Sequence, residues 1–334
     1  MAGIWFGVLV FALLMYVVLD GYDLGIGIAS MFERDKASRD KMLEQVAQAW
    51  DGNESWLVLA ALVLWAGYPT AFGAILPHAY LAVILMLFAL GVRGVSVELA
   101  SQTHDRALFE WTFGIGSLVA ALAQGALLSS LASRVTLVDN AFSGSAFGAF
   151  GWFTFLVCAL LVALYLSYGY AYMKWKSTGE LRTRVARRGE ITTAVTAMLA
   201  VAFFLALDNT DAPLNLDSAG RTVAFVVLLA AAGTGIAVAM WSLRPASTND
   251  GRSFVGLAIA TVAIAVAIVV GRYPTIVPGV PSVEDALSPD TTMWFLFVGI
   301  GINLPLIVFY TWFGHHAFRD KAYGTGARLP RSGR

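Results

Sequence analysis

The sequence predicts an all-α integral membrane protein with nine transmembrane helices. Hydrophobic residues make up 58% of the 334 residues and charged residues only 13%, about half of the roughly 25% that is usual in soluble domains. The mean hydropathy is +0.71. The formal net charge is zero, which argues against a nucleic-acid-binding protein. The single cysteine, Cys158, lies in an apolar run, so we expect neither a disulfide framework nor a cysteine-based metal site.

Nine stretches of the chain have the length of a membrane span, since a hydrocarbon core about 30 Å thick needs roughly 20 apolar residues per helix. The first span covers residues 4–32. Residues 55–92 carry no formal charge and are too long for one helix, so we place spans two and three there, divided around Pro69 and Pro77. The other six predicted spans are 111–133, one within 140–173, 191–207, 222–243, 253–271 and 291–316.

The distribution of Lys and Arg predicts the orientation of these helices. Nineteen of the 22 basic residues fall in alternate connections and in the tail after residue 316. Because cytoplasmic loops are enriched in Lys and Arg, we expect the N-terminus outside and the C-terminus in the cytoplasm. The predicted parts are a first four-helix bundle (1–134), a second four-helix bundle (135–271), and an outer Pro-rich loop, a peripheral ninth helix and a basic cytoplasmic tail (272–334).

Two acids lie inside the first predicted span. Asp20 and Asp23 are three residues apart and share one face of a helix, although an ionisable group in a span costs about 2.5–3.5 kcal/mol. Gly21 and Gly25 form a small-xxx-small pair that lets another helix approach closely. Two interpretations are open: a proton or cation relay between helices, or an interfacial pair that caps and anchors the helix end.

A second acidic cluster precedes the second predicted span. Asp51 and Glu54 have the spacing of a capping box, in which Asp51 accepts hydrogen bonds from free backbone N–H groups. Trp50 and Trp56 suit the membrane interface. The alternative to the capping box is a proton antenna on the cytoplasmic side, formed together with the acids of the first span.

Arg93 ends the third predicted span on the cytoplasmic side. Arginine side chains at such positions commonly extend to the lipid headgroups, and this is what we expect of Arg93. Burial in an ion pair with one of the acids is the alternative.

Histidine positions bear on haem binding, because a membrane haem takes axial His or Met ligands from a bundle interior. Only His78 is near a span, at its outer edge. His104 is in a loop, and His315 and His316 lie at the cytoplasmic end of the ninth span. No two histidines occupy mid-membrane positions on different helices, so the sequence predicts no haem ligand in this chain.

Three Gly-Ile-Gly sequences interrupt apolar helices, at residues 25–27, 114–116 and 299–301. None of them follows a strand or completes a GxGxxG pattern, which argues against nucleotide-binding loops. We expect each to mark a close approach between helices.

Two of these segments resemble a known family. Residues 20–27, Asp-Gly-Tyr-Asp-Leu-Gly-Ile-Gly, resemble the first-helix motif of subunit II of cytochrome bd-type quinol oxidases. Residues 50–57, Trp-Asp-Gly-Asn-Glu-Ser-Trp-Leu, resemble the WDGN-x-x-WL segment of that family. The C-terminal part is also similar, at Tyr273-Pro274, Val277-Pro278, Asp285-Ala286, Leu304-Pro305 and Tyr310-Thr311. The resemblance covers essentially the whole chain.

The resemblance implies two four-helix bundles plus a peripheral helix, and a function within a larger enzyme. The implied partner is subunit I, which carries haems b558, b595 and d and the quinol-oxidising loop. The complex oxidises quinol outside and reduces dioxygen to water with cytoplasmic protons. Other expected partners are the lipid of a bacterial or archaeal cytoplasmic membrane, a small accessory subunit and a structural quinone, for which no contacts are assigned. No independent catalytic activity is expected.

By motif match, Asp51 is the expected point at which cytoplasmic protons enter a path to the partner. Asp23, Asp20 and Glu54 are expected to belong to that path, as relay or as structural support. The residues expected at the subunit interface or in structural support are Trp50, Asn53, Trp56 and Arg93. The alternative function is a proton-coupled secondary transporter with Asp20 and Asp23 as its coupling site.

Overall fold

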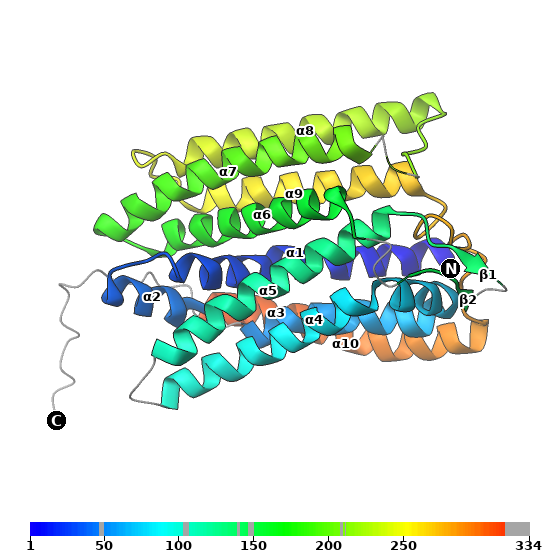
Figure 1. Cartoon of the computed structure of the whole chain (residues 1–334), viewed down its shortest axis with the longest axis horizontal. Coiled ribbons are helices and arrows are strands. Elements are labelled where there is room, and N and C mark those ends of the chain that lie inside the picture. Colours follow the sequence, from blue (N-terminus) through cyan, green and yellow to red (C-terminus); the bar gives the residue numbers. More distant parts are fainter. Residues whose placement is uncertain are drawn as a thin grey trace.

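The computed structural model describes residues 1–46, 50–102, 107–138, 141–145, 150–207, 210 and 212–317. Long helices lie side by side along the longest axis, and the N-terminus is at the end that carries a short hairpin (Figure 1). The elements are α1 (Ala2–Ser30), α2 (Lys36–Val46), α3 (Trp50–Leu62), the π-helical turn η1 (Val63–Gly67), α4 (Pro69–Gln102), α5 (Ala107–Ala132), β1 (Leu137–Val138), β2 (Ala141–Phe142), α6 (Trp152–Lys176), α7 (Gly179–Leu207), α8 (Ala219–Leu243), α9 (Gly251–Arg272) and α10 (Asp290–Ala317).

Eight of the described helices are long and apolar enough to cross a membrane, which makes this a multi-pass membrane protein. The predicted second span corresponds to α3 and η1, which are 13 and 5 residues long, so the count of nine stays a prediction. The break in residues 55–92 falls at Pro69, where α4 begins. Pro77 lies inside α4, and its predicted interruption is wrong because a membrane helix tolerates proline.

The helix α1 lies between two groups of helices (Figure 1). It packs against α3 and α5 on one side and against α6 on the other. Helices that follow one another pack in pairs, α4 with α5, α6 with α7 and α8 with α9, while α10 contacts α3 and η1. Because α1 contacts both groups, the predicted bundle boundaries at residues 134 and 271 stay a prediction.

Glycines set the closest approach between the two groups. A Cβ atom at Gly25 would overlap the carbonyl oxygen of Tyr165, and a Cβ at Gly169 would lie 2.5 Å from the Gly25 carbonyl carbon. At Gly21 the ring of Tyr165 would lie 2.8 Å from an added Cβ. The small-xxx-small prediction is therefore confirmed: these glycines let α6 lie directly on α1.

The first two Gly-Ile-Gly sequences also mark close contacts, as predicted. An added Cβ would collide with Ser117 at Gly27 and with Met31 at Gly114, between α1 and α5. The third prediction is wrong within this chain. Gly299 and Gly301 of α10 have nothing within 4 Å of an added Cβ, because α10 is peripheral and this part of its surface has no neighbour from the described residues.

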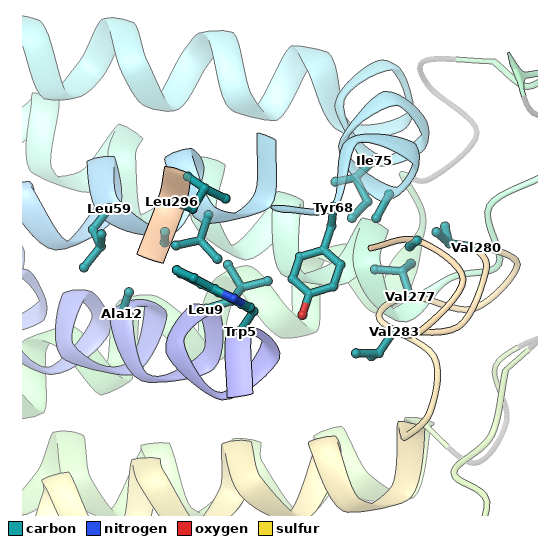
Figure 2. Close-up of a cluster of buried hydrophobic side chains, with 14 of the residues drawn as sticks. Trp5, Leu9, Ala12, Leu59, Tyr68, Ile75, Val277, Val280, Val283 and Leu296 are labelled. Atoms are coloured by element: carbon teal, nitrogen blue, oxygen red, sulfur yellow. The ribbon is translucent and has the colours of Figure 1, made fainter. Parts of the chain in front are cut away.

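An apolar cluster closes the end of the molecule at which α1 begins (Figure 2). Val277, Val280 and Val283 of the loop before α10 lie on the Tyr68 side of this cluster, which also contains Trp5. Backbone hydrogen bonds hold the loop in place, from Val135 N to Pro278 O (2.9 Å) and from Ser288 N to Gly67 O (2.9 Å). The Pro-rich loop is thus part of the packed structure.

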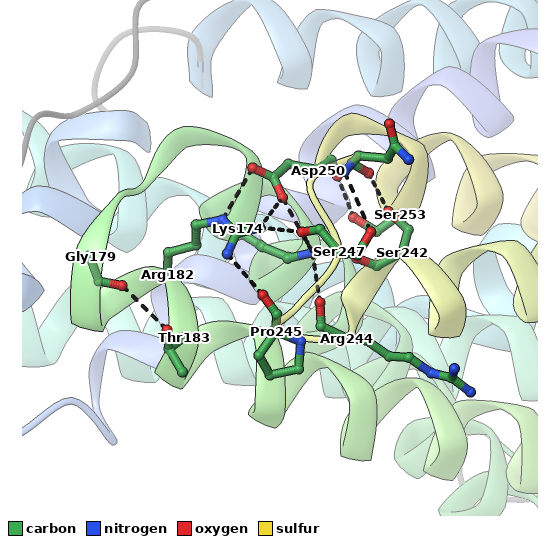
Figure 3. A network of polar contacts seen from close by, with 11 residues as sticks. Lys174, Gly179, Arg182, Thr183, Ser242, Arg244, Pro245, Ser247, Asp250 and Ser253 are labelled. Atoms are coloured by element: carbon green, nitrogen blue, oxygen red, sulfur yellow. Dashed lines mark hydrogen bonds and ion pairs between the residues drawn. The ribbon is translucent and has the colours of Figure 1, made fainter.

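A polar network joins α6 and α7 to the α8–α9 connection at the opposite end (Figure 3). The buried Lys174 ammonium donates to the carbonyl oxygens of Ser242 and Arg244 (3.3 Å) and lies 3.3 Å from Asp250 Oδ1. Arg182 donates to both carboxylate oxygens of Asp250, from Nη2 at 2.7 Å and from Nε at 3.2 Å. A positive charge at the last carbonyls of α8 is favourable, so the network fixes this helix end.

Gly25→Ala is expected to prevent most of the protein from folding, because the added methyl group meets the backbone of α6. Overpacking of this kind costs about 1–3 kcal/mol and occasionally more. The measurement is the yield and thermal unfolding midpoint of monodisperse protein in detergent. Gly7→Ala is the matched control on the same helix, where an added Cβ meets nothing within 4 Å. Equal yields of the two variants would contradict the described α1–α6 contact.

Asp250 is expected to stabilise the fold at neutral pH and to lose that effect in acid. Burial alone would raise the pKa of Asp250, but hydrogen bonds and charges from Arg182 and Lys174 outweigh it and hold the pKa below the ordinary value. Its contribution is therefore present above about pH 3.9, the unfolded value, and declines as pH falls through the lower folded value.

Asp250→Asn should accordingly lower the free energy of unfolding at pH 7 by about 1.5–3 kcal/mol, the range for hydrogen bonds to charged groups. The difference from the unchanged protein should shrink toward pH 3. Thermal unfolding in detergent at several pH values measures it, with the exposed Asp217→Asn as control. If the difference in unfolding free energy between Asp250→Asn and the unchanged protein grew toward acid pH, the stabilising role of the Asp250 carboxylate would be contradicted.

Candidate functional site

The two acids of the first helix are fully buried. Asp20 and Asp23 have 0% exposure although α1 continues to Ser30. The interpretation as an interfacial pair that anchors the helix end is therefore wrong. Neighbouring helices cover this part of α1 on both sides, because Gly21 and Gly25 admit α6 and the polar beginning of α3 packs opposite.

Arg93 is also fully buried and binds two acids from different helices. Its Nη2 donates to Asp20 Oδ1 and to Glu54 Oε1, both at 2.6 Å. The expectation that Arg93 extends to the headgroups is wrong, and the buried ion pair is the observed arrangement. Charge-assisted hydrogen bonds of this length are among the strongest in proteins, so Arg93 ties α4 to α1 and α3 at one point.

Asn53 brings the other acid of α1 into the same cluster. Its Nδ2 donates to Asp23 Oδ2 at 2.7 Å, to Tyr22 OH at 3.0 Å and to Leu19 O at 3.3 Å. We call Asp20, Asp23, Asn53, Glu54 and Arg93 the Arg93 cluster.

The capping box is not formed. Asp51 is the second residue of α3, inside the helix rather than before it, and the Glu54 carboxylate binds Arg93 instead of the helix start. Asp51 is exposed, while the Glu54 side chain is 24% exposed. These two acids thus link the surface at the predicted cytoplasmic end to the buried part of the cluster.

Aromatic side chains position α3 around these acids. The ring of Trp50 lies against Gly94 of α4, and the ring of Tyr310 from α10 lies against Gly52. Trp56 is fully buried and its Nε1 donates to Thr311 Oγ1 of α10 at 3.3 Å. In the described structure Trp50 and Trp56 therefore support the site from within the chain.

Several polar atoms of the Arg93 cluster have no hydrogen-bond partner among the described residues: Asp20 Oδ2, Asp23 Oδ1, Arg93 Nε and Arg93 Nη1. Buried atoms of this kind are commonly satisfied by internal water, which needs two to four polar partners. The cluster also contains three carboxyl groups and one guanidinium. An excess of carboxyl groups over cations in a buried, polar site is suited to take up and release protons.

A second polar group lies deeper in the bundle and was missed by sequence reasoning. The Tyr165 hydroxyl donates to Gln124 Oε1 at 2.5 Å, and Gln124 Nε2 donates to Tyr16 OH at 2.7 Å. All three side chains are buried. The available signal was Gln124, an amide in the middle of the uncharged span 111–133, where an unpaired polar group would be costly.

Of the histidines, His78 Nε2 lies 3.1 Å from Ser130 O, and its Nδ1 has no hydrogen-bond partner among the described residues. No group of three or more His, Cys, Asp or Glu suited to a metal occurs within the described ranges. His104 and the side chains of His315 and His316 lie outside the described residues. The prediction that this chain supplies no haem ligand stays a prediction.

Comparison with known proteins agrees with the motifs around this site. The family model described as "Cytochrome bd terminal oxidase subunit II" matches residues 1–318. "Cytochrome bd-I ubiquinol oxidase subunit 2" of Escherichia coli K12 is 30% identical over 202 residues, 58% of this chain and 53% of the relative, so this match spans about half of the relative's length. "Cytochrome bd ubiquinol oxidase subunit 2" of Bacillus subtilis is 22% identical over 330 residues, 95% of this chain and 96% of the relative.

The fold is similar to that of a chain in "The structure of bd oxidase from Geobacillus thermodenitrificans". The TM-score is 0.72 at 16% sequence identity, over 96% of this chain and 99% of that chain. The acids of the Arg93 cluster lie in the two segments on which the resemblance rests, and the family model covers nearly the whole chain. The chain belongs to the cytochrome bd terminal oxidase subunit II family.

Proposed function

We propose that the chain is the haem-free subunit of a cytochrome bd-type quinol:oxygen oxidoreductase in the cytoplasmic membrane of a bacterium or archaeon. In this role it binds and stabilises the haem-bearing subunit I and provides a path for cytoplasmic protons. Family membership supports the role in an oxidase and favours it over the proton-coupled transporter. One structural observation supports the proton path: the Arg93 cluster links the partly exposed Glu54 to Asp20 and Asp23, which are buried within the bundle.

The path begins at Asp51, which is exposed on the first turn of α3. Glu54 follows three residues later on the same face of the helix and is partly exposed. From Glu54 the hydrogen bonds of Arg93 lead to Asp20, and Asn53 holds Asp23 beside it. Subunit I supplies the haems at which dioxygen is reduced with electrons from quinol. The residues of this chain collect protons and hold them at carboxyl oxygens.

The negative charges at the surface increase the rate of proton uptake, because acids concentrate cations near an opening. Inside, neither Asp23 Oδ1 nor Asp20 Oδ2 has a hydrogen-bond partner among the described residues, and water bound beside these carboxyl groups carries the proton between groups that do not touch. Arg93 keeps the buried acids from repelling one another and cannot itself deprotonate. Its function is therefore to hold the acids in place.

The face that receives subunit I is formed by α3, η1 and α10. Glu54, Val58 and Ala61 recur along one face of α3, Trp65 follows in η1, and both Val58 (68%) and Trp65 (60%) are largely exposed. A carboxyl group at the end of an apolar face is better covered by protein than by lipid. Gly299 and Gly301 of α10 leave room for another helix. The structural quinone and the accessory subunit stay predictions without assigned residues.

The first experiment is a reduced-minus-oxidised visible spectrum of the complex purified from native membranes through a tag on this chain. We expect a far-red band from haem d together with haem b bands, because subunit I copurifies with its haems. Haem b bands without the haem d band would indicate a bd-type partner with an altered oxygen-reducing site. An intact preparation without any haem would contradict the proposed function and favour the transporter.

Asp51→Asn is expected to preserve assembly and haem content but to slow oxygen consumption about tenfold, at the low end of what charge-assisted uptake contributes. Glu54→Gln should slow it as well, since Gln retains an acceptor for Arg93 but no proton to exchange. Oxygen consumption and proton uptake by the purified complex measure both effects. The exposed acid Glu44 of α2 provides the control Glu44→Gln.

Full turnover and normal proton uptake in Asp51→Asn and Glu54→Gln would rule out the proposed path. Loss of the assembled complex in both variants would instead assign these acids a structural role. The control distinguishes a general effect of surface charge, which would slow Glu44→Gln to the same extent.

A further inference from the structure

A row of three buried hydrogen-bonding side chains crosses the middle of the bundle and is not used by the proton path described above. It contains Tyr165 of α6, Gln124 of α5 and Tyr16 of α1. Gln124 occupies an otherwise apolar neighbourhood, beside the buried residues Ala120, Ala121 and Ala123. A buried amide is costly unless all its polar atoms are bonded, and here both its oxygen and its nitrogen are bonded.

The hydrogen bonds of this row all run in one direction. Tyr165 donates its hydroxyl hydrogen to the amide oxygen of Gln124, so the amide nitrogen of Gln124 faces Tyr16 and donates to its hydroxyl oxygen. With its oxygen engaged as an acceptor, Tyr16 has its own hydroxyl hydrogen left to donate. The two residues behind Tyr16 thus fix the direction in which that hydrogen points.

The acceptor nearest in the sequence is Asp20, one helical turn further along α1 and therefore on the same face. Asp20 Oδ1 is bound by Arg93, whereas Asp20 Oδ2 has no hydrogen-bond partner among the described residues. Both side chains are buried, Tyr16 with 3% and Asp20 with 0% exposure. Asp20 Oδ2 is therefore the oxygen of Asp20 that the Arg93 cluster leaves open to a donor from the row.

We propose that Tyr16, oriented by Gln124 and Tyr165, is a positioning residue that donates a hydrogen bond to Asp20 and so determines how the exchangeable proton is shared among the carboxyl groups of the Arg93 cluster. The charged and titratable groups that face Asp20 come from four helices: Tyr16, Tyr22 and Asp23 on α1, Glu54 on α3, Arg93 on α4 and Tyr165 on α6. This proposal rests on the proton path proposed above.

Gln124 gives the row a second property. A carboxamide neither gains nor loses a proton at neutral pH, so a proton on Tyr16 is not passed through Gln124 to Tyr165. The row orients Tyr16 without opening a route from Asp20 toward α6. Tyr16 therefore influences the protonation of Asp20 through a hydrogen bond but does not itself carry protons along the path.

The test compares variants that remove single hydrogen-bonding groups from the complex purified with its partner. Tyr16→Phe removes only the hydroxyl group, and Gln124→Leu removes the orienting amide while Tyr16 remains. Tyr168→Phe is the matched control, since Tyr168 is a buried tyrosine of α6 whose hydroxyl donates to Thr261 Oγ1 at 2.9 Å, outside the row. The readouts are the pH profile of oxygen consumption and pH-difference infrared spectra of the carboxyl C=O region, with bands assigned by Asp20→Asn.

We expect Tyr16→Phe and Gln124→Leu to shift the carboxyl bands and to move the pH profile by about one unit, the size of effect that one hydrogen bond to a charged group has on a titration. Tyr168→Phe should leave both unchanged. Unchanged carboxyl bands in Tyr16→Phe would overturn the proposal, as would an equal shift in Tyr168→Phe. If Tyr16→Phe does not assemble, Gln124→Leu provides the test by itself. Unchanged carboxyl bands in Gln124→Leu would then overturn the proposal.

The infrared measurement also separates this proposal from the proposed function. It follows the titration of carboxyl groups and needs neither turnover nor Asp51. Shifted bands in Tyr16→Phe, combined with full turnover in Asp51→Asn, would keep the Tyr16–Asp20 interaction and reject the proton path. Unshifted bands in Tyr16→Phe, combined with slow turnover in Asp51→Asn, would keep the proton path and reject the Tyr16–Asp20 interaction.

Discussion

The buried guanidinium of Arg93 is the interaction on which the rest of this site depends. Carboxyl groups within a membrane protein are tolerated only where a partner or water compensates their charge, and Arg93 supplies that charge to Asp20 and Glu54 at once. Removing one member of a buried pair typically costs about 3–5 kcal/mol. Three helices, α1, α3 and α4, are therefore held in register by electrostatic attraction in addition to apolar packing.

The sequence predicted the structure correctly where a feature depends on the residues of a single helix. Long apolar stretches correspond to eight described helices that are long and apolar enough to span a membrane, and the Gly21 and Gly25 pair correctly indicated a close neighbour, which is α6. Its predictions were wrong where the structure depends on contacts with neighbouring segments. Pro77 has the appearance of a helix break in the sequence, but it lies inside the continuous helix α4. The helix α3 is short because the π-helical turn η1 and Pro69 follow it. Gly301 resembles a packing glycine, yet nothing from the described chain lies against it.

The same division holds for the site. The acids Asp20, Asp23 and Glu54 were identified from their cost in a membrane, which is a property of each residue alone. Their pairing with Arg93 was not identified. Arg93 is 73 residues from Asp20 and 39 residues from Glu54 in the sequence, and contacts over such separations leave no local sequence pattern. Gln124 illustrates the limit, since its polarity was visible in the sequence whereas its two tyrosine partners come from other helices.

The peripheral position of α10 has a consequence for biosynthesis. This helix is the last of the described spans to be made, yet its Tyr310 and Thr311 cover Gly52 and Trp56 in the segment that carries the cluster. Until α10 has been inserted, that side of α3 is bare, and lipid or water occupies the place of the tyrosine ring. The cover over this side of α3 is thus complete only after α10 has been inserted. A nascent chain arrested before this helix would hold its acids in the membrane without their final cover.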